Sequence, residues 1–309
     1  MKSIRSVPLA ISGLSLAFAS LGNLLLSLPC GEVIRYICGF ISAAILVVFT
    51  LRIILDFPKV QEELKTPVPL SVLPTVTMAL MLLCVYIRPY LEVFAIVVWS
   101  AAVIMHISII LLFFKRFILG FKLENVFPSW IIIGVGIGAV CVTAPAMGAV
   151  LIGQITFYIG FILYFAALAL IIYRVIVIGR IPDPVRPTIA IFTAPMSLLI
   201  VGYCNSFMNQ GRLNETLVFV MMAIASASYV YVTIMMFSLL RLKFYPTYAA
   251  FTFPYVISAT AFRIGAGFLA ERGLFFLYPV AQVSMWIAVV VVIYVIVRYI
   301  IFFQMALKS

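Results

Sequence analysis

The chain has 309 residues, of which 66% are hydrophobic and only 9% carry a charged side chain. Its mean hydropathy is +1.29, whereas charged residues make up about 25% of an ordinary soluble domain. No soluble core could bury this much apolar surface, so the composition excludes a soluble enzyme and indicates a polytopic integral membrane protein. We expect one transmembrane domain over residues 1–309.

Charged residues divide the chain into apolar runs that match the roughly 20 residues a membrane helix needs. The run between Glu124 and Arg174 is long enough for two helices and a tight turn. Strands of a membrane barrel would alternate in polarity, and these runs do not. We therefore predict an all-α fold of ten transmembrane helices in five successive hairpins. The hairpins are 6–28 with 31–55, 68–87 with 90–114, 127–147 with 151–178, 187–209 with 214–240, and 247–269 with 274–304.

The distribution of Lys and Arg predicts the orientation of these helices. If the N-terminus is cytoplasmic, 15 of the 20 Lys and Arg residues lie on the cytoplasmic side and 5 on the other. Cytoplasmic connections of membrane proteins carry this excess of positive charge. We expect both termini in the cytoplasm and the protein in the plasma (inner) membrane of a prokaryote. The excess of Lys and Arg in cytoplasmic connections then accounts for the net charge of +11. The charge therefore needs no nucleic-acid partner, and the expected partner is membrane lipid.

Proline is distributed unevenly between the two helices of each hairpin. The first, odd-numbered helices carry prolines at or inside their spans, whereas the even-numbered ones have only Pro89 and Pro279, near their starts. A proline kinks a helix, and in lipid such breaks occur where the backbone is buried in protein or faces water. We predict an inner ring of kinked odd helices around a central pore. The prolines concerned are Pro8, Pro74, Pro145, Pro195 and Pro254.

The expected membrane interior lacks the groups that coupled transport or catalysis requires. All nine acidic residues lie in connections or at helix ends, and the single histidine, His106, lies in mid-span. We expect His106 to be hydrogen-bonded in the helix bundle, with a proton relay as the alternative. So few reactive groups favour a passive pathway over a pump or an enzyme, and we expect neither a cofactor nor a metal site.

Arg263 is the one charge that stands out within a span. It lies ten residues after Phe253, which is about 15 Å along a helix and near the outer surface. Arg263 is a candidate for attracting anions to an outer mouth. The alternatives are snorkelling to the interface or pairing with Glu271.

Four segments in register resemble one known family. The chain is similar to the TehA and slow anion channel family, also called the tellurite-resistance/dicarboxylate transporter family, over all ten helices. The likeness rests on "EELKTPVPLSVLPTVTMALM" (62–81), "ENVFPSWIIIGVG" (124–136), "PDPVRPTIAIFTAPMSLLIVGY" (182–203) and "AAFTFPYVIS" (250–259).

This resemblance implies five helical hairpins around a quasi-five-fold axis and assembly as a homotrimer with one pore in each protomer. It implies passage of small monovalent anions, such as chloride and nitrate. The tellurite label describes a phenotype and implies no tellurium site. The resemblance also places the family's pore-blocking phenylalanine at Phe253, directly before Pro254, with Phe251 as the competing candidate.

The remaining candidates are residues near the expected kinks. Proline-broken helices expose helix ends that attract anions, and small residues leave a lumen open. The expected pore-lining residues are Phe251, Pro74, Pro145, Pro195, Pro254, Ser197, Ser258 and Ala259.

The leading function hypothesis is a passive anion channel gated by Phe253. Its alternative is a carrier or exporter of small organic acids, such as malate and other C4-dicarboxylates, or of sulfite. A third hypothesis is a membrane sensor or structural subunit that transports nothing, although the short connections leave no soluble output domain.

Overall fold

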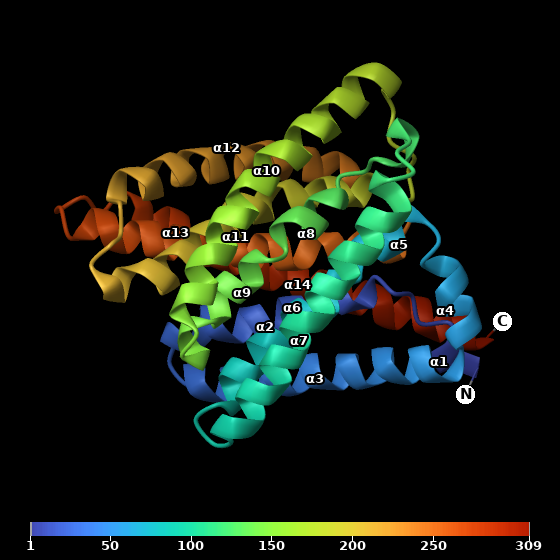
Figure 1. Ribbon diagram of the computed structural model, residues 1–309, viewed down its shortest axis with the longest axis horizontal. Coiled ribbons are helices and arrows are strands. Elements are labelled where there is room, and N and C mark those ends of the chain that lie inside the picture. Colours follow the sequence, from blue (N-terminus) through green and yellow to red (C-terminus); the bar gives the residue numbers. More distant parts are fainter. Residues whose placement is uncertain (1, 309) are drawn as a thin grey trace.

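The computed structural model describes the backbone of residues 2–308, and all their side chains except those of Lys2, Ser3, Asn209 and 306–308. All regular structure in this part of the chain is helical, and it contains no strand (Figure 1). This confirms the all-α prediction. Lys2 and Lys308, which contributed to the predicted orientation, have side chains outside the described set.

The second helix of every predicted hairpin is long and continuous. The helix α7 (Glu92–Phe113) passes at its end into a short π-helical segment, Phe114–Ile118. These even-numbered spans are α3 (Gly31–Leu55), α7 (Glu92–Phe113), α10 (Val150–Ile178), α12 (Glu215–Leu239) and α14 (Leu277–Lys308).

The first helix of every hairpin is interrupted or shortened instead. Two short helices, α1 (Lys2–Arg5) and α4 (Phe57–Glu63), belong to neither helix of any hairpin. The odd-numbered segments are α2 (Ile11–Leu24) with the 3-10 turn Leu25–Ser27, α5 (Pro67–Val72) with α6 (Pro74–Ile87), α8 (Trp130–Val135) with α9 (Gly138–Thr143) and the 3-10 turn Pro145–Met147, the 3-10 helix η5 (Arg186–Thr193) with α11 (Ala194–Phe207), and the 3-10 helix η7 (Pro246–Phe251) with α13 (Thr252–Ala270).

Three α-helices begin at or near a predicted proline, and a fourth predicted proline, Pro145, begins the 3-10 turn Pro145–Met147. Pro74 is the first residue of α6, Pro195 the second of α11 and Pro254 the third of α13. The first turn of a helix tolerates proline because its N–H groups have no partner within the helix. The prolines therefore start new helices inside the apolar runs.

The sequence did not predict the interruption in the third hairpin. The expected helix 127–147 is two six-residue helices, α8 and α9, separated at Gly136 and Ile137. A Cβ atom on Gly136 would lie 3.1 Å from Cε1 of His106, so a side chain at this position would crowd the imidazole. Glycine also weakens a helix by about 1 kcal/mol relative to alanine.

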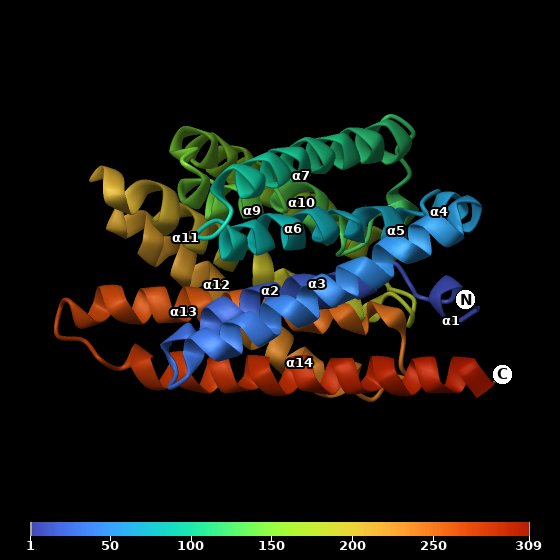
Figure 2. The same ribbon diagram turned by 90° about the horizontal axis from the view of Figure 1, so that it is seen from below.

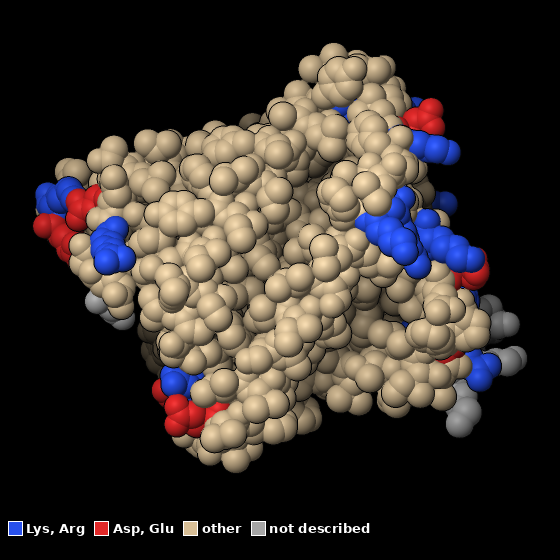
Figure 3. Space-filling model, viewed as in Figure 1, with Lys and Arg blue, Asp and Glu red and all other residues tan. Residues whose placement is uncertain are grey.

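Among the described residues, eight segments are long and apolar enough to cross a membrane, whereas Ile11–Ser27 is a shorter apolar helix and the 130–147 segment is broken. The prediction of ten membrane segments therefore corresponds to eight full-length spans together with these two. The space-filling view shows the same division, because charged side chains gather at the two ends of the molecule and the surface between them is uncharged (Figure 3).

Burial separates the two sets of helices. Among the membrane-length spans, 67–89% of residues are buried in the odd-numbered segments and 17–33% in the even-numbered ones. In α2, every residue except Gly13 and Asn23 is buried. Figure 2 shows α7 and α14 on opposite sides of the bundle, with α2 and α6 between them. The odd-numbered segments therefore form the interior, and the even-numbered helices cover it.

Polar side chains inside the bundle are largely paired. The hydroxyl of Thr77 donates to the carbonyl of Pro74 and lies 2.6 Å from Nδ1 of His106, so the ring nitrogen donates to Thr77. This confirms that His106 is hydrogen-bonded. The acidic residues lie in connections or at helix ends, as predicted.

Close packing between odd-numbered segments depends on small residues such as Gly202 of α11, and a substitution at this position tests that dependence. A Cβ on Gly202 would lie 2.7 Å from Sγ of Cys141 in α9. We expect Gly202→Ala to destabilise the purified protein by about 1–3 kcal/mol, because overpacking forces the two helices apart. The measurement is the thermal unfolding midpoint in detergent. Gly267→Ala in α13 is the control, because a Cβ there meets nothing within 4 Å. Equal midpoints for the two variants would contradict the close contact.

Candidate pore and its constriction

Two cavities lie one after the other within the bundle. The first, of about 510 Å³, is lined by Arg5 and Phe302 and therefore lies at the end of the molecule that holds both chain termini. The second, of about 620 Å³, is lined by Asn23 and Asn205 near the opposite end. We call them the near cavity and the far cavity. Together they extend through most of the length of the bundle.

Every odd-numbered segment lines both cavities. In α2, Gly13 lines the near cavity and Asn23 the far cavity. In the last odd-numbered segment, Ala250 lines the near cavity and Thr260 of α13 the far cavity. The other three segments also contribute to both cavities. Their residues in the near cavity include Thr75, Val135 and Ile191. Their residues in the far cavity include Val85, Val142 and Val201. No even-numbered helix lines the far cavity among the residues the structure describes.

Three apolar side chains line both cavities. They are Leu16 of α2, Leu198 of α11 and Phe253 of α13, and they are 1%, 4% and 7% exposed. Because each of them faces a cavity on either side, they separate the two spaces. We call these three residues the apolar constriction.

The predicted site residues divide into two groups by their position. Phe253 lies in the apolar constriction, Pro195 and Pro254 line the near cavity, and Pro145 lines the far cavity.

The other predicted lining residues face away from the cavities. Phe251 is fully buried, with its ring 4.8 Å from that of Tyr248. Ser197 and Ser258 are fully buried, lie 3.1 Å apart, and both donate to the carbonyl of Thr193. Pro74 and Ala259 are also buried and line neither cavity.

Arg263 lies between two lining residues of the far cavity, Thr260 and Ile264, but does not itself line the cavity. Its guanidinium donates to the carbonyl of Leu24, in the last turn of α2. No ion pair with Glu271 is present among the described residues. Arg263 thus places a positive charge against the C-terminal end of α2, where the helix dipole is negative.

The near cavity carries charged side chains at its opening. Arg5, Arg52, Lys59 and Glu63 all line it. Arg52 is only 1% exposed, and its guanidinium pairs with Asp56 at 3.2 Å and with Glu63 at 2.9 Å.

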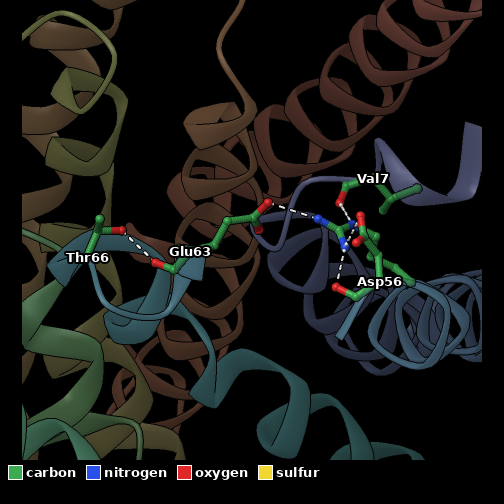
Figure 4. A network of polar contacts seen from close by, with 5 residues as sticks. Val7, Asp56, Glu63 and Thr66 are labelled. Carbon is green, nitrogen blue, oxygen red and sulfur yellow. Dashed lines mark hydrogen bonds and ion pairs between the residues drawn. The ribbon is translucent and has the colours of Figure 1, made fainter. Parts of the chain in front are cut away.

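Arg52 also connects three parts of the chain at this opening. Its Nε donates to the carbonyl of Val7, which precedes α2, while Glu63 belongs to α4 (Figure 4). The C-terminal end of α3 is thereby tied to both neighbouring segments.

Sequence reasoning did not identify Leu16, Leu198 or Arg52 as site residues. The two leucines resemble the many other leucines of the chain, and only their tertiary position makes them part of the constriction. Arg52 did carry a signal, because it is an arginine followed by acids at positions 56 and 63 at the end of a predicted span.

The geometry of the interior defines a class of protein. The chain is an integral membrane protein whose interior contains two successive cavities separated by an apolar constriction. The described lining holds no group of three or more His, Cys, Asp and Glu residues that could hold a metal ion. Two successive cavities of this kind suit the movement of a small solute through the bundle.

Comparison with known proteins gives the family. Residues 6–302 match the SLAC1 family, described as voltage-dependent anion channels, and the chain belongs to this family. Its members are anion channels and transporters rather than enzymes. A relative named as an uncharacterized transporter, MJ0762 of Methanocaldococcus jannaschii, is 28% identical over 204 residues. The match covers 59% of this chain and 58% of the relative.

The buried guanidinium of Arg52 offers a test of the near opening. We expect Arg52→Met to destabilise the protein by about 2 kcal/mol, because it leaves Asp56 and Glu63 without their partner. The two carboxylates are 24% and 30% exposed, so water reduces the cost. The thermal unfolding midpoint measures the effect. Lys65→Met is the control, since it removes the exposed pair with Glu62, worth about 0–1 kcal/mol. A midpoint for Arg52→Met equal to that of the control would contradict this role.

Proposed function

We propose that this protein is a passive channel for small monovalent anions such as chloride and nitrate, with Phe253 as its gate. The observation that carries the proposal is the position of Phe253 in the wall of both cavities, together with Leu16 and Leu198. Membership of a family of anion channels supplies the class of solute.

An apolar constriction stops ions because it offers them no replacement for their hydration shell. Hydrophobic constrictions of this kind gate channels by excluding water. A phenyl ring is the largest of the three side chains here, so its rotation or removal would open the path most. Pro254 follows Phe253 directly, and a helix start at this point leaves the ring near a break in the backbone.

The finer architecture is part of the same proposal. The five odd-numbered segments form a proline-kinked inner ring with quasi-five-fold symmetry, and the whole chain is one transmembrane domain. Both features are supported by the contribution of each odd-numbered segment to both cavities. We further propose assembly as a homotrimer in the plasma (inner) membrane of a prokaryote, by likeness to the TehA type of channel.

The alternative is a carrier or exporter of small organic acids, such as C4-dicarboxylates, or of sulfite. The name of the relative from Methanocaldococcus jannaschii, a transporter, favours it. The lack of an acidic side chain along the described lining between Glu63 and the far opening favours the channel. Saturable, gradient-driven uptake into liposomes would identify the carrier.

Replacing the proposed gate gives the direct test. We expect wild-type protein in a planar bilayer to pass little current and Phe253→Ala to pass a large current. In a chloride gradient, the reversal potential of the variant should follow the chloride equilibrium potential. The reason is that alanine leaves the constriction without its bulkiest side chain.

Phe251→Ala is the matched control for this experiment. Its ring packs against Tyr248 and lines neither cavity, so the variant should remain closed. A folded Phe253→Ala variant without current, or an equal current through Phe251→Ala, would contradict the proposed gate.

Cys30 provides a natural reporter for the proposed orientation. It is an exposed free cysteine between α2 and α3, on the side expected to face outward. We expect a membrane-impermeant maleimide to label wild-type protein in intact spheroplasts and to leave Cys30→Asn unlabelled. In the Cys30→Asn background, Lys122→Cys should be labelled only after permeabilisation. The reverse pattern would invert the proposed topology.

A further inference from the structure

Two polar side chains one turn apart on α2, Ser20 and Asn23, line the far cavity beside the apolar constriction. The polar lining residues of this cavity other than Cys204 are Ser20, Asn23, Thr143, Asn205 and Thr260.

Three of these five side chains already donate a hydrogen bond to the protein, although the amide of Asn205 keeps a second N–H. The hydroxyl of Thr143 donates to the carbonyl of Ala139, and that of Thr260 donates to the carbonyl of Val256. The amide nitrogen of Asn205 donates to the carbonyl of Val142 at 2.9 Å.

Ser20 differs from these residues. Its side chain is only 6% exposed, yet it lines the far cavity and its hydroxyl makes no hydrogen bond to any other described residue. A buried hydroxyl without a partner costs free energy unless a solute or water completes it. Because Ser20 lines the far cavity, a solute or water there can complete the hydrogen bonding of its hydroxyl.

Asn23 lies one helical turn further along α2, on the same face as Ser20. Its Oδ1 accepts a hydrogen bond of 3.0 Å from Nε of Arg35. Its amide nitrogen makes only a long contact of 3.4 Å with the carbonyl of Ala19, which already accepts a 2.6 Å bond from Tyr86. Because Arg35 occupies the oxygen, the amide presents its N–H groups as donors.

Two guanidinium groups place positive charge next to Ser20 and Asn23. Arg35 bonds to the side chain of Asn23, and Arg263 bonds to the carbonyl of the next residue, Leu24. The C-terminal end of α2 would otherwise repel an anion, because its free carbonyls carry partial negative charge. The two arginines offset that charge where α2 reaches the far cavity.

Leu16 of the apolar constriction precedes Ser20 by one turn on the same helix. The sequence of groups along α2 is therefore an apolar side chain, then a hydroxyl donor, then an amide donor. An ion that reached the constriction from the far side would meet the two donors first.

We propose that Ser20 and Asn23 form a binding site for a small monovalent anion, such as chloride, directly beside the apolar constriction on the far side. This inference deepens the proposed channel function and rests on it for the direction of ion flow. The ligand chemistry is a desolvated inorganic anion held by one O–H and one N–H donor, without an ion pair.

The first test measures how current through the Phe253→Ala channel saturates with chloride concentration. We expect Ser20→Ala and Asn23→Asp each to raise the half-saturating concentration at least fivefold. Asn23→Asp keeps the oxygen that accepts from Arg35 and removes the N–H donors. Ser20→Thr retains a hydroxyl and should restore saturation, which separates a lost donor from a misfolded protein.

Two matched variants control for packing and for charge. Ser15→Ala removes a buried hydroxyl of the same helix that bonds to Ser42 and lines neither cavity, so saturation should stay unchanged. Asn205→Asp adds the same charge to the far cavity as Asn23→Asp does, and we expect a smaller effect. Equal effects of the two Asp variants, or no effect of Ser20→Ala, would overturn the proposed site.

A second readout does not depend on current. Chloride exchanging on a protein site broadens its ³⁵Cl NMR line, and we expect purified wild-type protein in nanodiscs to broaden it more than the Ser20→Ala, Asn23→Asp double variant. Equal broadening overturns the site. Lost broadening in the double variant together with a silent Phe253→Ala channel would uphold the site and overturn the proposed channel function.

Discussion

The structure depends on one constraint, which is that every backbone polar group inside a membrane needs a partner within the protein. The helices of the odd-numbered segments are interrupted, and hydroxyl side chains supply hydrogen-bond partners for backbone carbonyls at the interruptions. Ser12 donates to the carbonyl of Leu9, Thr252 donates to that of Ala249, and the carbonyl of Thr193 accepts from two serines. Such breaks are tolerated because the surrounding even-numbered helices keep them away from lipid.

The same constraint explains why the cavities lie where they do. A continuous helix presents a closed row of side chains, whereas a helix that restarts in mid-membrane leaves room beside the break. All five interrupted or shortened segments contribute to both cavities, and the continuous helices line only the near opening among the described residues. The solute path and the irregular backbone are thus two consequences of one arrangement. The covering helices contribute apolar surface and leave the interior to the odd-numbered set.

The sequence was sufficient to predict the membrane class, the all-α fold and roughly where the long apolar helices begin and end. Composition, charge spacing and proline positions are local signals, so they can be read from the sequence without knowledge of the tertiary structure. The break at Gly136 was missed because a glycine in an apolar run is ordinary in membrane helices. In the folded protein this glycine lies against the imidazole of His106, which is 30 residues earlier in the chain, so no local sequence signal marks the contact.

The candidate site was harder to predict because side-chain direction decides it. Ser197 and Ser258 have the small polar side chains expected of a lumen, yet both hydroxyls bond to the backbone at a helix junction. Phe251 and Phe253 are two residues apart, and only the second lies between the cavities. The far cavity holds no ionised side chain among its described lining residues, whereas the near one is lined by Arg5, Arg52, Lys59 and Glu63. In the proposed channel, such unlike halves would make the current rectify: equal and opposite voltages would drive unequal currents, since ions entering from each end would meet different local concentrations.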